Sequence, residues 1–258
     1  MSAPFPVVLL TDFGTQDPYV GQMKSVLQWE SPYPPIIDLS HDVPSQDETA
    51  AAFLLEYSIE YCPPNSILLL VVDPFVGTER DIIAAETTQD RVVVAPDRHL
   101  IDGLDFTKVH RVLQPNVPGL KQESDTFHGR DWFAPAGRIL ALGGTLEDLG
   151  PLIDYQSRNS RVPEPEKKDS EIVGEVVYVD RFGNLITNIP GEMVDKPNEW
   201  RVRIGDSTIE EYRQTYGKGN LPIFLEGSFK RYEIAVTGGN ARKRLSVDPG
   251  DRVRFIHR

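Results

Sequence analysis

The sequence contains a single cysteine, Cys62, among its 258 residues, so the chain cannot form an intrachain disulfide. It also lacks long hydrophobic runs, and no stretch approaches the roughly 20 apolar residues that span a bilayer. The apolar segment near the N-terminus is short and has no basic residues before it, unlike a secretory signal peptide. These absences predict a cytoplasmic protein with no membrane partner.

Positive charge is scarce. The chain carries 27 Lys and Arg against 39 Asp and Glu, a formal net charge of −12, and no segment gathers Lys and Arg into a run of more than a few. Binding to nucleic acid requires concentrated positive charge that displaces counterions from phosphates, so we expect no nucleic-acid partner. The glycine-rich motifs of dinucleotide and phosphate sites are missing, as is the G-x-S-x-G motif of serine hydrolases.

Strand-like and helix-like segments alternate through the first half of the chain. Short apolar runs at 7–10, 36–37, 67–72, 82–85 and 92–95 have the composition of buried strands. Helix formers dominate 18–29, 47–57 and 135–142, and Asp17 precedes the first of these as the expected N-cap. This alternation predicts a layered α/β N-terminal domain over residues 1–155 with a mostly parallel sheet.

The composition changes after residue 155. Residues 156–170 are rich in proline and charge and are expected to form a solvated linker. Beyond it, short strand-like segments at 175–178, 200–204, 222–225, 232–236 and 252–256 are separated by Gly, Asn, Asp or Pro. The pattern predicts a smaller all-β barrel domain over residues 171–258.

Acidic residues follow several of the expected strands, namely Asp12, Asp38, Asp73 and Asp97. In open α/β sheets, ligands bind outside the carboxyl ends of the strands, so these acids define a candidate site. Each acid alone could instead stabilise a turn or cap a helix. The segments after these strands also contain residue types that bind metal in metal-dependent hydrolases, although their spacing in the sequence matches no metal-binding motif. These potential ligands are Asp12, Asp38, His41, Asp42, Asp73 and His99.

Four sequence blocks, in order, resemble the SAM hydroxide adenosyltransferases, relatives of the SAM-dependent fluorinase and chlorinase. The blocks are T-D-F-G-T with D-x-Y-V-G at 11–21, V-V-D-P-F-V-G-T-E-R at 71–80, T-F-H-G-R-D-W-F-A-P at 126–135, and D-R-F-G-N with T-N-I at 180–189. The resemblance covers nearly the whole chain. It implies an α/β domain followed by a β-barrel, and a homotrimer that binds its ligand between the first domain of one subunit and the second domain of its neighbour.

The resemblance also assigns roles to individual residues. It implies that Asp73, Arg80 and His128 are catalytic, and that these residues distinguish enzymes that transfer hydroxide from enzymes that transfer halide. The implied substrate-binding residues are Asp12, at the ribose, together with Gly129, Asp180, Phe182, Asn184 and Ser228. The implied reaction hydrolyses S-adenosyl-L-methionine (SAM) to adenosine and L-methionine without a metal or other cofactor.

In such a reaction the enzyme must chiefly activate the nucleophile. The sulfonium group of SAM leaves C5′ as the neutral thioether of methionine, so the leaving group needs no proton. Bulk water, with a pKa of about 15.7, is a poor nucleophile and must be oriented and deprotonated. We expect Asp73 to orient or deprotonate the water, His128 to assist as a base or relay, and Arg80 to stabilise the developing hydroxide.

Three other functions remain open from the residues. Halide transfer is disfavoured by Asp73 and Gly129, because the halogenases carry a tyrosine and, in the fluorinase, a serine at those positions. A regulatory module that binds SAM or adenosine without turnover is a second alternative, and a metal-dependent hydrolase is the third. The chain departs from the family at Phe75, where glycine is usual, at Arg98-His99, where Asn-Gly is usual, and in a longer stretch at 228–232.

Overall fold

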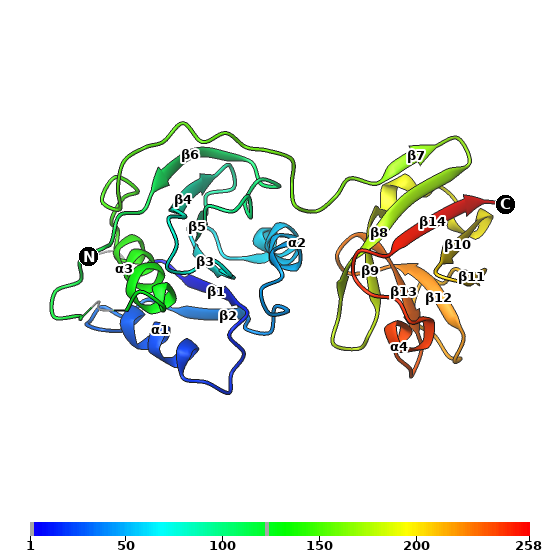
Figure 1. Ribbon diagram of the computed structural model, residues 1–258, viewed down its shortest axis with the longest axis horizontal. Coiled ribbons are helices and arrows are strands. Elements are labelled where there is room, and N and C mark those ends of the chain that lie inside the picture. The colour runs from blue at the N-terminus through cyan, green and yellow to red at the C-terminus, as the bar shows by residue number, and fades with distance from the viewer. Residues whose placement is uncertain (1–2, 122–123) are drawn as a thin grey trace. The chain divides into compact units, whose positions relative to one another are not determined.

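The computed structural model describes residues 3–121 and 124–258; residues 1, 2, 122 and 123 of the expected first domain lie outside the described part. The chain divides into two compact units, residues 1–161 and 162–258 (Figure 1). The first unit combines helices with a mixed sheet, and the second is almost entirely β-structure.

A six-stranded sheet with the order β2-β1-β3-β5-β4-β6 forms the centre of the first unit. Its strands are β1 (Val7–Thr11), β2 (Ile36–Ser40), β3 (Ile67–Val71), β4 (Ile82–Thr87), β5 (Val92–Pro96) and β6 (Phe106–Arg111). The pairs β1–β2, β1–β3 and β3–β5 are parallel, whereas β4 runs antiparallel to both β5 and β6. Both β1 and β3 are buried along their whole length, as their continuous apolar sequences predict.

Three helices pack on this sheet: α1 (Tyr19–Leu27), α2 (Glu48–Ser58) and α3 (Ala134–Ala141). Apolar residues of α1 and α3 share one core cluster with alternate residues of β1 and β3. The helix α2 begins as expected, since the Asp47 carboxylate accepts a hydrogen bond from the Ala50 N–H at 2.9 Å. The expected N-cap of α1 is wrong, because Pro18 occupies that position and no side chain caps the helix.

Short helical turns extend two of these elements. A 3₁₀ turn, η1 (Ile59–Tyr61), follows α2, and a π-helical turn, η2 (Gly129–Phe133), leads directly into α3. The π turn was not predicted from the sequence. Single π turns within α-helices occur frequently at functional sites.

An eight-stranded sheet builds the second unit, with the order β11-β10-β14-β8-β9-β13-β12 and β7 paired to β8. Its strands are β7 (Glu166–Lys168), β8 (Glu171–Val179), β9 (Leu185–Pro190), β10 (Trp200–Ile204), β11 (Ser207–Ile209), β12 (Pro222–Glu226), β13 (Arg231–Val236) and β14 (Arg252–His257). All of these pairings are antiparallel, and the two end strands β11 and β12 contact each other, so the sheet forms a nearly closed barrel. Its remaining elements are the 3₁₀ turns η3 (Gly191–Met193) and η4 (Pro197–Glu199) and the helix α4 (Ala241–Leu245).

The expected linker, 156–170, contacts the first unit at one end and contains a short strand at the other. Its first part belongs to the first unit: the Arg158 N–H donates to Asp102 at 2.7 Å, and the Arg161 guanidinium pairs with Glu48 at 2.8 Å. Residues 166–168 form β7, whose backbone pairs with β8. Hydrogen bonds, an ion pair and backbone pairing thus involve parts of this segment, while most of its residues are exposed. Within the described residues, no helix is long and apolar enough to cross a membrane.

Candidate active site

A cavity of about 290 Å³ opens at the carboxyl ends of β1 and β3. Asp12 immediately follows β1 and Asp73 follows β3, and both carboxylates line the cavity. In the sheet, β2 pairs with one side of β1 and β3 pairs with the other side. The cavity therefore lies at the topological switch point, where ligands bind in open α/β sheets. The remaining lining residues are Phe13, Tyr19, Ser45, Gln46, Val71, Val76, Thr126, Phe127, His128 and Gly129.

The three expected catalytic side chains form one hydrogen-bonded group. The Arg80 guanidinium donates from Nε to both carboxylate oxygens of Asp73, at 3.0 and 2.9 Å, and from Nη2 to Oδ2. The same Nη2 lies 2.8 Å from Nδ1 of His128. The side chains of Arg80 and Asp73 are only 7% and 6% exposed, so this is a buried, bidentate pair.

This geometry fixes the proton position on His128. A guanidinium has only donors, so Nδ1 of His128 must accept the hydrogen bond from Arg80. The neutral imidazole therefore carries its proton on Nε2. Burial and the nearby Arg80 charge lower the pKa of His128, which favours this neutral form near pH 7. His128 can thus donate a hydrogen bond from Nε2. Of the three side chains, Asp73 is the one that can accept a hydrogen bond from a molecule in the cavity.

Close packing joins the two loops that carry these side chains. Gly77 has a φ of +80°, and a Cβ at this position would lie 2.9 Å from the backbone oxygen of Asp125. A side chain at residue 77 would therefore push the loop 73–80 away from the loop that leads to His128.

A buried carboxylate anchors the loop that carries His128. Asp131 is fully buried within η2; its Oδ2 accepts from the Ser124 N–H at 3.0 Å and its Oδ1 from Nε of Arg130 at 2.6 Å. Arg130 also donates to Gln22 of α1 at 3.2 Å. The residues before and after His128 are in this way tied to η2 and to α1.

Asp12 lies in the same cavity, close to the start of α2. Its Oδ2 accepts a 2.8 Å hydrogen bond from the Gln46 N–H, which fixes the carboxylate and leaves further acceptor positions. Burial raises the pKa of Asp12, and the hydrogen bond from Gln46 offsets part of this effect. A fixed carboxylate at a cavity wall can accept hydrogen bonds from vicinal hydroxyls such as those of a ribose.

Aromatic rings form another wall of the cavity. Phe127 contacts Tyr19 and Phe13 with ring centroids 5.1 and 5.7 Å apart. A Cβ on Gly129 would lie 3.1–3.2 Å from Phe127, Met23 and Phe13, so the absence of a side chain at residue 129 leaves room for these rings. No role for these rings or for Gln46 was predicted from the sequence; the position of Gln46 just before the helix N-cap was the one available signal.

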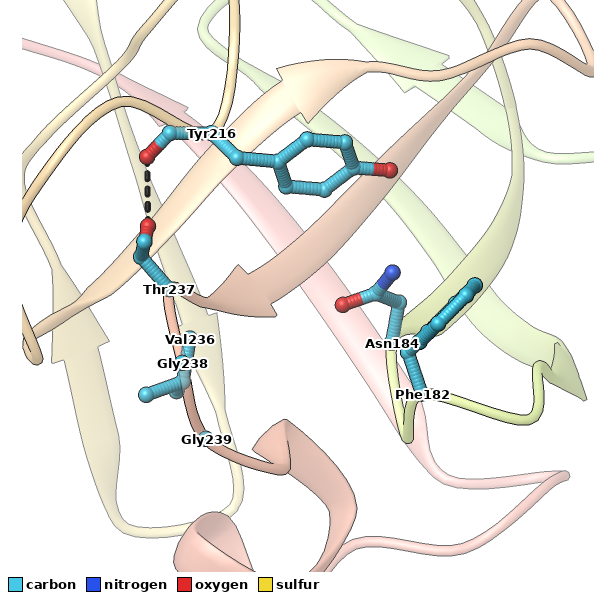
Figure 2. A pocket seen from close by; sticks show the side chains of 7 residues that line it. All are labelled: Phe182, Asn184, Tyr216, Val236, Thr237, Gly238 and Gly239. Carbon is cyan, nitrogen blue, oxygen red and sulfur yellow. Dashed lines mark hydrogen bonds between the residues drawn. The ribbon is translucent and has the colours of Figure 1, made fainter.

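The second unit contains a separate cavity of about 500 Å³ (Figure 2). The Tyr216 ring lies on one side, Phe182 and Asn184 on another, and the segment 236–239 along a third. Phe182 is 74% exposed, whereas Asn184 is buried. The open, partly aromatic space could hold a flat ring or an apolar chain.

Asp180 shapes the loop that carries two of these lining residues. Its Oδ1 accepts from the N–H groups of Phe182 and Asn184 at 2.9 and 2.8 Å, and its Oδ2 accepts from the Asn184 side chain at 2.9 Å. Gly183 has a φ of +83°, and any Cβ there would collide with Asn240. Asp180 therefore organises the loop, while Phe182 and Asn184 line the cavity.

Ser228 lies elsewhere. It is exposed in the turn between β12 and β13, near Pro190, whereas the cavity-lining residues follow the other end of β13. The six residues of β13 separate the two ends by roughly 17 Å. The structure thus brings Phe182 and Asn184 together but does not bring Ser228 to their cavity.

The other acids at or near strand ends, Asp38 and Asp97, do not line this cavity. Asp38 receives hydrogen bonds from Lys24 at 2.6 Å and His41 at 3.0 Å, and it lies within β2 rather than beyond its end. Asp97 does not line the cavity, and His99 pairs instead with Asp102 at 3.0 Å. Among the described residues, no group of three or more His, Cys, Asp or Glu side chains is arranged to hold a metal ion.

Comparisons with known proteins match both units. Residues 7–150 match the SAM hydroxide adenosyltransferase N-terminal domain, and residues 174–254 match the corresponding C-terminal domain. The chain is 37% identical over 263 residues to the (R)-S-adenosyl-L-methionine hydrolase of Thermus thermophilus, covering 97% of this chain and 99% of that protein. It is 34% identical over 262 residues to the protein of the same name from Salinispora tropica, covering 98% of each.

A solved structure agrees with this similarity. The crystal structure of an uncharacterized conserved protein from Thermotoga maritima superposes with a TM-score of 0.89 at 31% identity. The superposition covers 97% of this chain and 100% of that one.

Proposed function

The chain belongs to the SAM hydroxide adenosyltransferase family, and from this premise we propose that it hydrolyses SAM to adenosine and L-methionine at the cavity of its first unit. The family is one of enzymes, and the relatives that share a third or more of their residues with this chain are named as hydrolases of SAM. The activity is therefore hydrolysis at a sulfonium-bearing carbon.

One observation carries the assignment of the site. Asp73, Arg80 and His128 come from separate parts of the sequence and form a single buried hydrogen-bonded group beside Asp12. Charged groups that are buried and converge on a cavity are characteristic of functional sites. Four other cavities of the described residues have no histidine in their lining.

The geometry supports a separate role for each of these residues. Asp12 binds the ribose hydroxyls, which places C5′ in the cavity. Asp73 accepts a hydrogen bond from the attacking water and takes its proton as the new C5′–O bond forms. The C5′–S bond breaks in the same displacement, and its electron pair leaves with the thioether of methionine.

Arg80 and His128 support this displacement. Arg80 holds Asp73 in position, and Nε2–H of His128 donates a hydrogen bond to the water oxygen as negative charge develops there. In-line placement of water and sulfonium contributes up to roughly 7–11 kcal/mol in the best intramolecular cases. Positioning is therefore as important in this proposal as proton transfer.

The relatives' names also specify a stereoisomer of the substrate. Since the prefix L already describes the amino-acid carbon, we assign R to the sulfonium sulfur. We propose that this chain likewise prefers the R epimer at sulfur, and that the second-unit cavity of Phe182 and Asn184 binds another part of the same substrate.

The quaternary arrangement is part of the proposal. The candidate residues are divided between two units, each with its own cavity, which suits a homotrimer whose ligand lies between the first domain of one subunit and the second domain of the next. Mixing Asp73→Asn with Asn184→Ala subunits tests this. Recovered activity in mixed oligomers is expected; complete inactivity of every mixture would contradict it. The lone cysteine is compatible with a reducing cytoplasm, the compartment that we propose.

Product analysis tests the function. The purified protein, treated with a chelator, would be incubated with each sulfonium epimer of SAM, and the products identified by mass spectrometry. We expect equal amounts of adenosine and methionine, formed faster from the R epimer. Formation of S-adenosylhomocysteine or methylthioadenosine, or the absence of turnover despite binding, would contradict the proposal.

A further inference from the structure

The loop between the two charged catalytic residues has an aromatic ring near its tip. Phe75 lies between Asp73 and Arg80 and remains 42% exposed. The guanidinium carbon of Arg98 lies only 4.2 Å from the centroid of this ring, within the range of a cation–π contact. The loop is thus attached at Phe75 to the segment that follows β5.

Arg98 is itself held from two sides. Its Nε pairs with Oε1 of Glu48 at 3.0 Å, and the other carboxylate oxygen of Glu48 pairs with Nη2 of Arg161 at 2.8 Å. Nε of Arg161 also donates to the backbone oxygen of Arg98 at 2.7 Å. Glu48 is only 11% exposed and begins α2, so this network is anchored in the body of the first unit.

The loop that Arg98 contacts through Phe75 also lines the cavity. Val76, next to Phe75, lines the cavity together with Asp73. Phe75 also accepts hydrogen bonds at its backbone oxygen from the N–H and hydroxyl of Thr78, at 3.1 and 2.8 Å, which keep the loop compact. Displacement of the ring would therefore move the backbone that carries Asp73.

We propose that Arg98, fixed by Glu48 and Arg161, is a positioning residue that acts through Phe75 to hold the loop 73–80 in its catalytic arrangement. The inference rests on the proposed function, because it concerns the residues that carry out that reaction. Arg98 touches neither the substrate site nor the reacting atoms; it acts on the placement of Asp73 and Arg80.

Four variants test this role: Phe75→Leu, Phe75→Tyr, Arg98→Met and the double variant Phe75→Leu/Arg98→Met. A cation–π contact at a partly exposed site converts to roughly a two- to fivefold change in rate, so we expect each single loss to lower kcat by about that factor. The affinity for adenosine should not change, and Phe75→Leu should keep the wild-type thermal midpoint, whereas Arg98→Met should lower it somewhat because Glu48 loses one of its two arginine partners. Phe75→Tyr keeps the ring and should restore the wild-type kcat.

The double variant and a control separate positioning from general damage. If Arg98 acts through Phe75, the double variant should be no slower than the slower single variant, because both remove the same contact. Lys108→Met is the matched control. Lys108 is a cation of the same unit, but it pairs with Glu86, at a distance of 3.8 Å, and not with the loop 73–80. It should leave kcat unchanged.

The outcomes are distinguishable. A wild-type protein that forms no adenosine from SAM would overturn the proposed function itself. An active wild type with unchanged kcat in Phe75→Leu and Arg98→Met would overturn the positioning role alone. Equal loss in Phe75→Leu and Phe75→Tyr, or multiplicative losses in the double variant, would also overturn it.

Discussion

Replacing Asp73 by asparagine removes the proposed proton acceptor while keeping its shape. The amide oxygen can still accept a hydrogen bond from Arg80, but its NH₂ group cannot, so part of the bidentate pair is lost. The side chain is only 6% exposed, and the change leaves the Arg80 charge without its counterion. We therefore expect a lower thermal midpoint and a protein that still folds.

The kinetic effect follows from the role of Asp73. General base catalysis contributes on the order of 10²–10⁴-fold, which corresponds to about 3–5 kcal/mol of transition-state stabilisation. Asp12 and the second-unit residues are untouched, so substrate binding should be nearly unchanged. The loss is expected in kcat, with KM altered by no more than about threefold.

Steady-state kinetics and equilibrium binding of SAM to the slow variant would measure these two effects separately. Asp125→Asn is the matched control, because Asp125 also acts electrostatically on His128 yet is exposed and does not line the cavity. It should retain most of the wild-type kcat. A wild-type kcat in Asp73→Asn, or an equal loss in both variants, would refute the reasoning.

Three further predictions concern other residues of the site. Asp12→Asn should raise KM for SAM by roughly 10- to 100-fold, since a hydrogen bond to a charged group contributes about 1.5–3 kcal/mol; an unchanged KM in steady-state assays would exclude the ribose contact. Burial and Arg80 lower the pKa of His128 below the ordinary value of 6.5; because only the neutral ring accepts the hydrogen bond from Arg80, this contact, and the activity that depends on it, should persist below that pH and be lost as the pH falls through the lowered pKa. NMR titration of the imidazole would show this, and a pKa above 6.5 would contradict it. Asp131→Asn should lower both the thermal midpoint and kcat by weakening the pair with Arg130; wild-type values of both in calorimetry and rate assays would exclude an anchoring role.

The sequence predicted those parts of the fold that depend on local composition. Apolar runs located β1 and β3, and the helix formers over 47–57 located α2, because burial on both faces and helix propensity leave direct signals. The strands β6, β7, β9 and β11 were missed. The sequence of β9, LITNIP, includes an asparagine and a proline, and its pairing with β8 and β13 is a tertiary effect.

The site was partly predictable for a similar reason. Acids after strands pointed to Asp12 and Asp73, but the same signal at Asp38 and Asp97 was misleading, since only the neighbours β1 and β3 form the switch point. The tautomer of His128 depends on a contact across 48 residues, which no local pattern encodes.

The most direct test of the central claim is the position of solvent oxygen in the product. The protein would be incubated with SAM in ¹⁸O-water, and the adenosine analysed by mass spectrometry with fragmentation between ribose and base. We predict one ¹⁸O atom in the ribose fragment, at the 5′ oxygen, with unlabelled methionine, because water attacks C5′. Adenosine without label, or label confined to methionine, would contradict hydroxide transfer at this carbon.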